Sequence, residues 1–213
     1  MSTFLTIIII LSSTFVFLKS LRRERYEYIN AKPILSKYNQ VKAVCANLPA
    51  HKNGFSTIRE QVDAMNQGME ILHCGECGRC SNHNDIQVMK NTHKTLTKTV
   101  TGCAIQGLLL GDKAAEKCLE KKVGFTPACS SCWSDNIRCT RKKCRFTCIK
   151  SLISKEPNNH DGMDLNPCLE CDERLCGPTF IECAGANRRR LGIESDIKRN
   201  KEQELCHHTA HKK

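Results

Sequence analysis

The hydrophobic positions of this chain follow a helical period through most of its length. The first such segment starts at Thr57-Ile-Arg-Glu60, which matches a capping box. Five apolar residues recur at alternating steps of four and three: Ile58, Val62, Met65, Met69 and Leu72. Residues spaced in this way lie on one face of an α-helix. The pattern predicts a helix over residues 57–72, which ends before Gly75 and Gly78.

A second helical pattern begins near Asn82 or Asn84, either of which makes a good N-cap. Steps of three and four place one set of mostly apolar residues on a common face: Ile86, Met89, His93, Leu96, Val100 and Cys103. The same face continues to Cys118, with a break allowed at Gly111-Asp112. Gly124 is expected to end this helical segment.

Two further helices are predicted where a capping residue is followed by proline, at Thr126-Pro127 and Asn166-Pro167. Residues 154–162 between them read as a loop, and Gly177-Pro178 is expected to break or kink the last helix. Alternating β-branched residues are nearly absent, so strands are not expected. The predicted fold class is therefore all-α, a small disulfide-rich helical bundle behind an N-terminal apolar helix.

That N-terminal helix is predicted from an almost unbroken apolar run over residues 3–18. As a helix the run spans roughly 24 Å, slightly less than a bilayer core. It suits the apolar region of a signal peptide or a signal-anchor. A small-x-small cleavage site is hard to find, which favours an uncleaved single-pass anchor over residues 1–20. Residues 21–44, which are basic and polar, would then form a juxtamembrane stalk.

The orientation of this anchor is a conflict between two signals. Lys19, Arg22, Arg23 and Arg25 follow the apolar run, and the positive-inside rule would keep them in the cytosol. The cysteine content favours an oxidising compartment instead. We expect export, because long translocated domains are known exceptions to the rule. The expected location is a membrane, with the cysteine-rich domain of residues 45–206 lumenal or extracellular, or secreted if cleavage occurs, and with a basic His-containing tail over residues 207–213.

Cysteine is the most informative residue type in the composition. The chain has 213 residues and 16 cysteines, a density typical of disulfide scaffolds, and the number is even. Few aromatic residues share the stretch, so disulfides would compensate for a thin core. The candidates for disulfide bonding are Cys45, Cys74, Cys77, Cys80, Cys103, Cys118, Cys129, Cys132, Cys139, Cys144, Cys148, Cys168, Cys171, Cys176, Cys183 and Cys206.

Two alternatives use the same cysteines differently. C-x2-C steps occur at Cys74/Cys77, Cys77/Cys80, Cys129/Cys132 and Cys168/Cys171. Each step has the spacing of one half of a zinc site, although the cysteines that would complete the site have the wrong spacing. A cytosol-facing zinc-binding protein is one alternative. The C-x2-C steps at Cys129 and Cys168 lie in the first turn of a predicted helix, where a thiol is more reactive. A thiol-disulfide oxidoreductase that uses one of these steps is therefore the other alternative.

The charge of the chain bears on its partners. The formal net charge is +11, which favours an acidic protein or lipid head groups. Arg188, Arg189 and Arg190 form a candidate basic contact patch. Nucleic-acid binding is not expected, because no aromatic residues are interleaved with these arginines. No catalytic residue can be named, and apart from the zinc alternative no metal or cofactor is expected.

Four motifs together resemble a known group of sequences. They are Cys74-Gly-Glu-Cys-Gly-Arg-Cys-Ser81, Val123-Gly-Phe-Thr-Pro-Ala-Cys129, Cys168-Leu-Glu-Cys-Asp-Glu-Arg-Leu-Cys-Gly-Pro178 and Cys183-Ala-Gly-Ala-Asn-Arg-Arg-Arg190. As a set they resemble an uncharacterised family of cysteine-rich proteins predicted from algae and other protists, over about residues 70–206. The resemblance implies one evolutionary unit and no particular activity. The sequence thus predicts a non-enzymatic, disulfide-stabilised binding or interaction protein whose partner is not specified.

Overall fold

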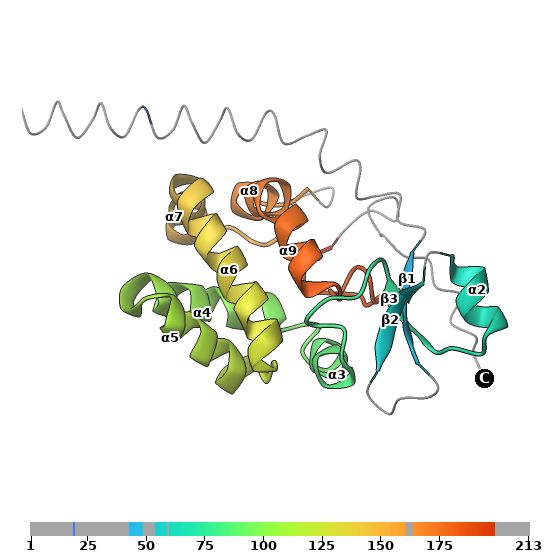
Figure 1. Cartoon of the computed structure of the whole chain (residues 1–213). Coiled ribbons are helices and arrows are strands. Elements are labelled where there is room, and N and C mark those ends of the chain that lie inside the picture. The colour runs from blue at the N-terminus through green and yellow to red at the C-terminus, as the bar shows by residue number, and fades with distance from the viewer. Residues whose placement is uncertain (1–18, 20–42, 49–53, 59, 161–163, 199–213) are drawn as a thin grey trace, which may run out of the picture.

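The computed structural model describes residues 19, 43–48, 54–58, 60–160 and 164–198. The described chain is mostly helical, with one small sheet (Figure 1). Its elements are β1 (Val44–Asn47), β2 (Phe55–Ile58), α2 (Gln61–Asn66), β3 (Ile71–Cys74), α3 (His83–Asn91), α4 (Leu96–Leu110), α5 (Asp112–Cys118), a π-helical turn η1 (Leu119–Val123), α6 (Pro127–Lys143), α7 (Arg145–Ile153), α8 (Pro167–Leu175) and α9 (Gly177–Ala184). The predicted predominance of helix is confirmed.

The expectation of no strands is wrong. The sheet has the order β2-β1-β3, and both pairings are antiparallel. Cys45 on the central strand faces Thr57 on one side and His73 on the other. This sheet and α2 lie at the opposite end of the molecule from α4 and α5 (Figure 1).

The sheet replaces the helix predicted over residues 57–72. Only residues 61–66 are helical there, and Gly68 follows with a φ of 65°, a conformation that suits glycine. Val62, which belonged to the predicted buried face, is 63% exposed. Ile58 and Ile71 instead lie on strands and pack on a small core of Val44, Ala46 and Ala64. The apolar spacing therefore reflects strand residues on either side of a short helix.

The predicted helix starts are confirmed at three caps. The Asn82 side chain accepts a hydrogen bond from the backbone N–H of Asp85 at the start of α3. Thr126 caps α6 by accepting from the backbone N–H of Cys129, and Asn166 caps α8 in the same way. In α6 and α8 a proline occupies the first turn, where no intrahelical N–H is needed.

The second helical pattern is divided more often than expected. The predicted break at Gly111 is confirmed, and Gly124 ends the segment with a φ of 95°. A further break separates α3 from α4 at residues 92–95. There the Thr92 hydroxyl donates to the carbonyl of Val88, and threonine hydroxyls bonded in this way often bend or end helices. Between α8 and α9 the chain turns at Cys176, just before Gly177-Pro178, as predicted.

The main core lies between α3, α4, α5 and α6 and contains few large side chains. Its largest fully buried apolar residues are Met89, Leu96 and Leu119, and they are accompanied by many cysteines. Gly107 of α4 faces Ala115 of α5, where a Cβ on the glycine would come within 2.7 Å of the alanine Cβ. The two helices therefore pack backbone to backbone, with little volume to bury between them.

Several predictions concern residues outside the described part of the chain: most of the signal-anchor and stalk, the tail over residues 207–213, and Cys206. Within the residues that the structure does describe, none of the helices combines the length and the apolar character needed to cross a bilayer.

Candidate functional site

Four disulfides connect α6 and α7 to α8 and α9. They are Cys132–Cys183, Cys139–Cys176, Cys144–Cys171 and Cys148–Cys168. As the first partner moves along the chain, the second moves back along it, so the two helical segments run antiparallel. Their Cα–Cα distances lie between 4.4 and 5.9 Å. We call this set the disulfide ladder. It holds the α6–α7 segment and the α8–α9 segment together along their length.

The remaining bridges tie other elements to this frame. Within the described residues these are Cys45–Cys77, Cys80–Cys129 and Cys103–Cys118. Cys74 is disulfide-bonded as well. The prediction of a disulfide-stabilised domain is confirmed, and extensive disulfides favour an oxidising, lumenal or extracellular environment.

The C-x2-C steps do not form bridges within themselves. Cys129 bonds to Cys80 whereas Cys132 bonds to Cys183, and the cysteines of the other helix-start step likewise bond to two different partners. A thiol-disulfide enzyme cycles through a bridge inside its C-x2-C step, and a zinc site needs thiolates. The described part of the chain contains no cluster of three or more His, Cys, Asp or Glu residues that could hold a metal.

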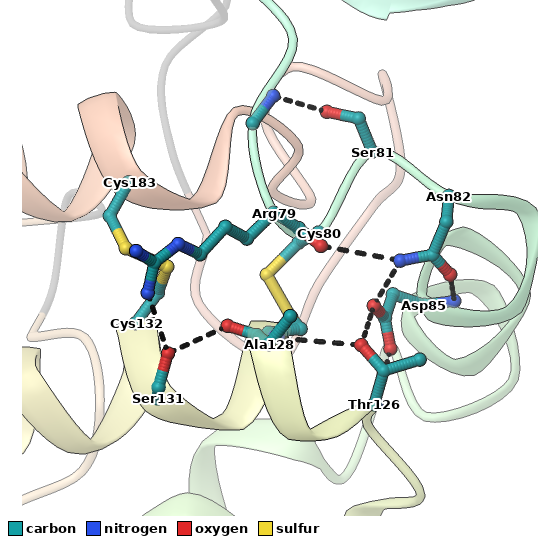
Figure 2. The surroundings of a disulfide bond; sticks show 12 residues. Arg79, Cys80, Ser81, Asn82, Asp85, Thr126, Ala128, Ser131, Cys132 and Cys183 are labelled. Atoms are coloured by element: carbon teal, nitrogen blue, oxygen red, sulfur yellow. Dashed lines mark hydrogen bonds between the residues drawn. A yellow bond between two sulfur atoms is a disulfide. The ribbon is translucent and has the colours of Figure 1, made fainter. Parts of the chain in front are cut away.

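A buried carboxylate fixes the start of α6 beside the Cys80–Cys129 bridge (Figure 2). Asp85 is fully buried, and its two oxygens accept hydrogen bonds from the backbone N–H and the hydroxyl of Thr126, at 2.7 and 2.6 Å. Asn82, the cap of α3, donates to the same carboxylate at 2.5 Å. Asp85 thus links the first turns of two helices, and we assign it a structural role.

A second buried polar pair joins the sheet to the same region. The Nε2 atom of His73 lies 2.7 Å from the Ser81 hydroxyl, which also accepts a hydrogen bond from the backbone N–H of Gly78. Both side chains have no exposed surface. A substrate could not reach this His–Ser pair, so it is not a candidate catalytic dyad.

The candidate site is an open groove with a cavity of about 680 Å³. One wall is α4 and the floor is α6, while α7, α8 and α9 form the rest. Apolar side chains dominate its lining, among them Val100, Ala104, Ile137, Leu169, Phe180 and Ile181. We call this cavity the groove.

Hydrogen bonds at two ends of the groove place α7 opposite α4. Arg141 near the end of α6 donates to the carbonyl of Gly107 near the end of α4, at 3.3 Å. At the other end, Asp196 accepts from the backbone N–H of Thr97 in the first turn of α4, and its carbonyl accepts from Asn158, which follows α7. The chain therefore passes along α7 in the direction opposite to α4, and residues of both helices line the groove.

An aromatic cluster forms part of the wall of the groove. The Trp133 ring stacks on Phe125, with 5.5 Å between ring centroids and an interplanar angle of 16°. Phe180 packs edge-on against the same ring at 4.7 Å. Within the described structure the buried Nε1 of Trp133 has no hydrogen-bond partner. A buried indole N–H normally finds an acceptor, and no described residue provides one here.

A carboxyl group lies next to the aromatic cluster. Asp172 of α8 accepts hydrogen bonds from Asn136 at 3.1 Å and from Thr140, both on α6. Burial raises the pKa of Asp172 to about 6, although the two hydrogen bonds oppose that rise. The buried Oδ1 of Asn136 has no partner among the described residues. The residues that line the groove thus include a buried donor and a buried acceptor without partners in the described structure, and a carboxyl group with a raised pKa.

The other charged groups that line the groove have protein partners. Arg141 forms an ion pair with Asp112 at 2.8 Å, and Glu156 accepts a hydrogen bond from the hydroxyl of Ser151 at 2.7 Å. The charge of Arg141 is thereby neutralised, and the carboxylate of Glu156 is hydrogen-bonded within the protein. The lining therefore keeps its apolar character despite the net charge of the chain.

The three consecutive arginines do not form an open surface patch. Arg190 is only 5% exposed, and its guanidinium donates to the carbonyl of Gly185 at 3.0 Å. Arg188 forms an ion pair with Asp196 and donates to the carbonyl of His93 at 3.0 Å. Arg189 lies 3.8 Å from a carboxylate oxygen of Glu173. The structure thus uses these charges to attach the C-terminal loop to the helices.

The polar groups of the groove were not identified from the sequence. Trp133, Asn136, Ile137 and Thr140 recur on α6 at steps of three, one and three, which places them on one helix face. That spacing was the available signal, but the cysteines on the same helix dominated the pattern. The position of Asp172 opposite this face depends on the ladder and could not be read from spacing.

Comparison with known proteins gives one match. Residues 112–208 match a family of unknown function (DUF8771). The matched segment begins with α5 and includes the whole ladder and the α6–α9 side of the groove, whereas α4 lies outside it. No curated protein and no solved structure matches the chain. The match agrees with the resemblance noted from the motifs in one respect, since neither assigns an activity.

Proposed function

We propose that the cysteine-rich domain is a binding protein that holds a small amphipathic molecule in the groove. The observation that carries this proposal is the open cavity of about 680 Å³, which has an apolar lining and a few polar groups on α6 and α8. Ligand sites in proteins commonly measure about 300–1,000 Å³ and have this composition. The earlier expectation of a binding protein thereby gains a specific site.

The polar groups indicate the class of ligand. Trp133 Nε1 needs an acceptor, and the carboxylate of Asp172 attracts a donor. A hydroxyl group or an uncharged amine at one end of an apolar molecule can fill both roles, because each can donate and accept. A fatty acid would bring a second carboxylate toward Asp172 at neutral pH, and like charges in an apolar site repel. We therefore favour an apolar alcohol or amine over a fatty acid.

The test uses the position of Trp133, which is the single tryptophan of the chain. N-phenyl-1-naphthylamine, an uncharged aromatic amine, should bind with saturation, quench the Trp133 emission and gain emission of its own. A long-chain alcohol should displace this probe at lower concentration than the fatty acid of equal length. A non-saturating signal, or preference for the fatty acid at neutral pH, would contradict the proposal.

Variants locate the binding site on the structure. Ala104→Phe adds a ring inside the groove and should abolish saturable binding, and Thr101→Phe does the same from an exposed position in the wall. Ala128→Phe is the matched control, because Ala128 is exposed in the first turn of α6 and does not line the groove. Equal probe affinity in the two groove variants and the control would place binding elsewhere.

A further inference from the structure

The opening of the groove is bordered by exposed apolar residues on both sides. Ile105 and Leu108 of α4 line the groove on one side, and Ile149 and Leu152 of α7 line it on the other. These four side chains are between 40% and 56% exposed. On α7 the apolar residues recur with a helical period, so they share one face of that helix.

The apolar surface extends beyond the cavity to the ends of the same two helices. Leu109 and Leu110 complete α4 and are 77% and 71% exposed, and Ile153 completes α7 at 76%. Of the nine large apolar residues that are exposed in the described structure, seven lie on α4 and α7. Exposed apolar side chains in this number on the two helices that line one groove mark an interaction surface. We call the exposed surfaces of α4 and α7 the mouth face.

The charge around the mouth face is mostly positive. Residues 136–155, which include α7, contain seven basic residues and no acidic one. They are Arg138, Arg141, Lys142, Lys143, Arg145, Lys150 and Lys155. Residues 86–111, which include α4, contain three lysines and again no acidic residue. Asp112 and Asp135 neutralise Arg138 and Arg141 in part, but Arg145, Lys150 and Lys155 are exposed beside the apolar residues.

We infer that the mouth face docks on an anionic lipid bilayer. Apolar side chains at the ends of two helices can enter the boundary between head groups and acyl chains, while lysine and arginine stay at the level of the phosphates. Both the exposed leucines and the one-sided charge are thereby accounted for. Docking in this orientation places the opening of the groove against the lipid, so an amphipathic ligand could enter without crossing water. That consequence rests on the proposed function, whereas docking itself does not.

Hydrogen exchange measured on the full chain tests this inference. The chain is compared on vesicles of phosphatidylcholine alone and on vesicles that also contain phosphatidylserine. Because the basic residues that follow the N-terminal apolar segment also favour anionic vesicles, the comparison is made at the amides of α4 and α7 and not from total binding. Amides over residues 105–110 and 149–153 should exchange several-fold more slowly on the anionic vesicles, and high salt should remove the effect. Equal exchange on both vesicles would overturn the inference.

Two variants separate docking from other effects. Leu109→Glu with Ile153→Glu places acids on the mouth face and should abolish the protection. Val62→Glu is the matched control, since Val62 is also exposed and apolar but lies on α2 at the other end of the molecule (Figure 1). Soluble polyglutamate serves as an acidic protein: stronger protection by it than by anionic vesicles would assign the face to a protein partner and refute docking on lipid. Loss of docking with normal probe binding would leave the proposed function intact.

Discussion

Asparagine in place of Asp172 removes a charge from the wall of the groove while keeping its shape. The carboxylate accepts hydrogen bonds from Asn136 and Thr140, and the carbonyl oxygen of an asparagine side chain can accept both. Its amide nitrogen takes the place of Oδ2, which makes only the longer contact, at 3.4 Å from the side-chain nitrogen of Asn136. The variant Asp172→Asn is therefore expected to keep the local hydrogen bonds and to lose only the ionisation.

The size and sign of the effect follow from the pKa. Burial raises the pKa of Asp172 from 3.8 to about 6. Between these two pH values the native state binds a proton that the unfolded state has released, so the stability of the native protein rises as the pH falls from 7 toward 4. Above pH 6 the carboxyl of Asp172 is ionised in the folded as well as in the unfolded state. Its burial then lowers the free energy of unfolding by about 3 kcal/mol. Asp172→Asn should recover that amount at neutral pH and show no advantage at pH 4.

Guanidinium unfolding of the full chain with its disulfides intact measures this difference. The wild type and the variant are compared by far-UV circular dichroism at pH 7.5 and at pH 4. Asp135→Asn is the control on α6, because Asp135 is exposed and paired with Arg138. A variant that is no more stable than the wild type at pH 7.5 would refute the reasoning, as would an equal gain at both pH values.

Two further predictions concern the frame of the domain. Replacing Cys103 and Cys118 with alanine opens a loop of 15 residues and should cost about 3 kcal/mol of unfolding free energy; replacing Cys139 and Cys176 should cost less, although they are 37 residues apart, because the neighbouring bridges of the ladder keep that loop short. Denaturant titration of the two double variants decides the order, and the reverse order would show that the bridges act independently. Arg190→Ala should lower stability by about 2–4 kcal/mol, since it leaves buried carbonyls without their donor; unchanged unfolding with altered vesicle binding would instead restore this arginine to a contact role.

The parts of the fold that were predicted correctly depend on contacts within a few residues. Thr126-Pro127 and Asn166-Pro167 begin helices because the cap and the proline act on the adjacent turn. Gly111 and Gly124 end helical segments because each adopts a positive φ. In these cases the local sequence contains the whole cause, and the tertiary structure does not oppose it.

The sheet could not be predicted because its cause is not local. Residues 55–58 and 71–74 form strands only when β1 lies between them. Nothing in the short segment Val44–Asn47 marks it as a central strand. The Cys45–Cys77 bridge joins that strand to residues just beyond β3, and sequence alone does not reveal which cysteines pair.

The groove also depends on pairing that spacing does not determine. On α6, Cys132 and Cys139 are two turns apart and bond to cysteines at the α9 and α8 side. Asn136 and Thr140 lie on an adjacent face of α6, turned by about 70° on average at 100° per residue. Covalent bonds on one face hold the walls, so the neighbouring face is not needed for packing. A domain held together by a core would lose stability with such a hollow. Because the ladder supplies the restraint instead, this domain can keep an open apolar groove.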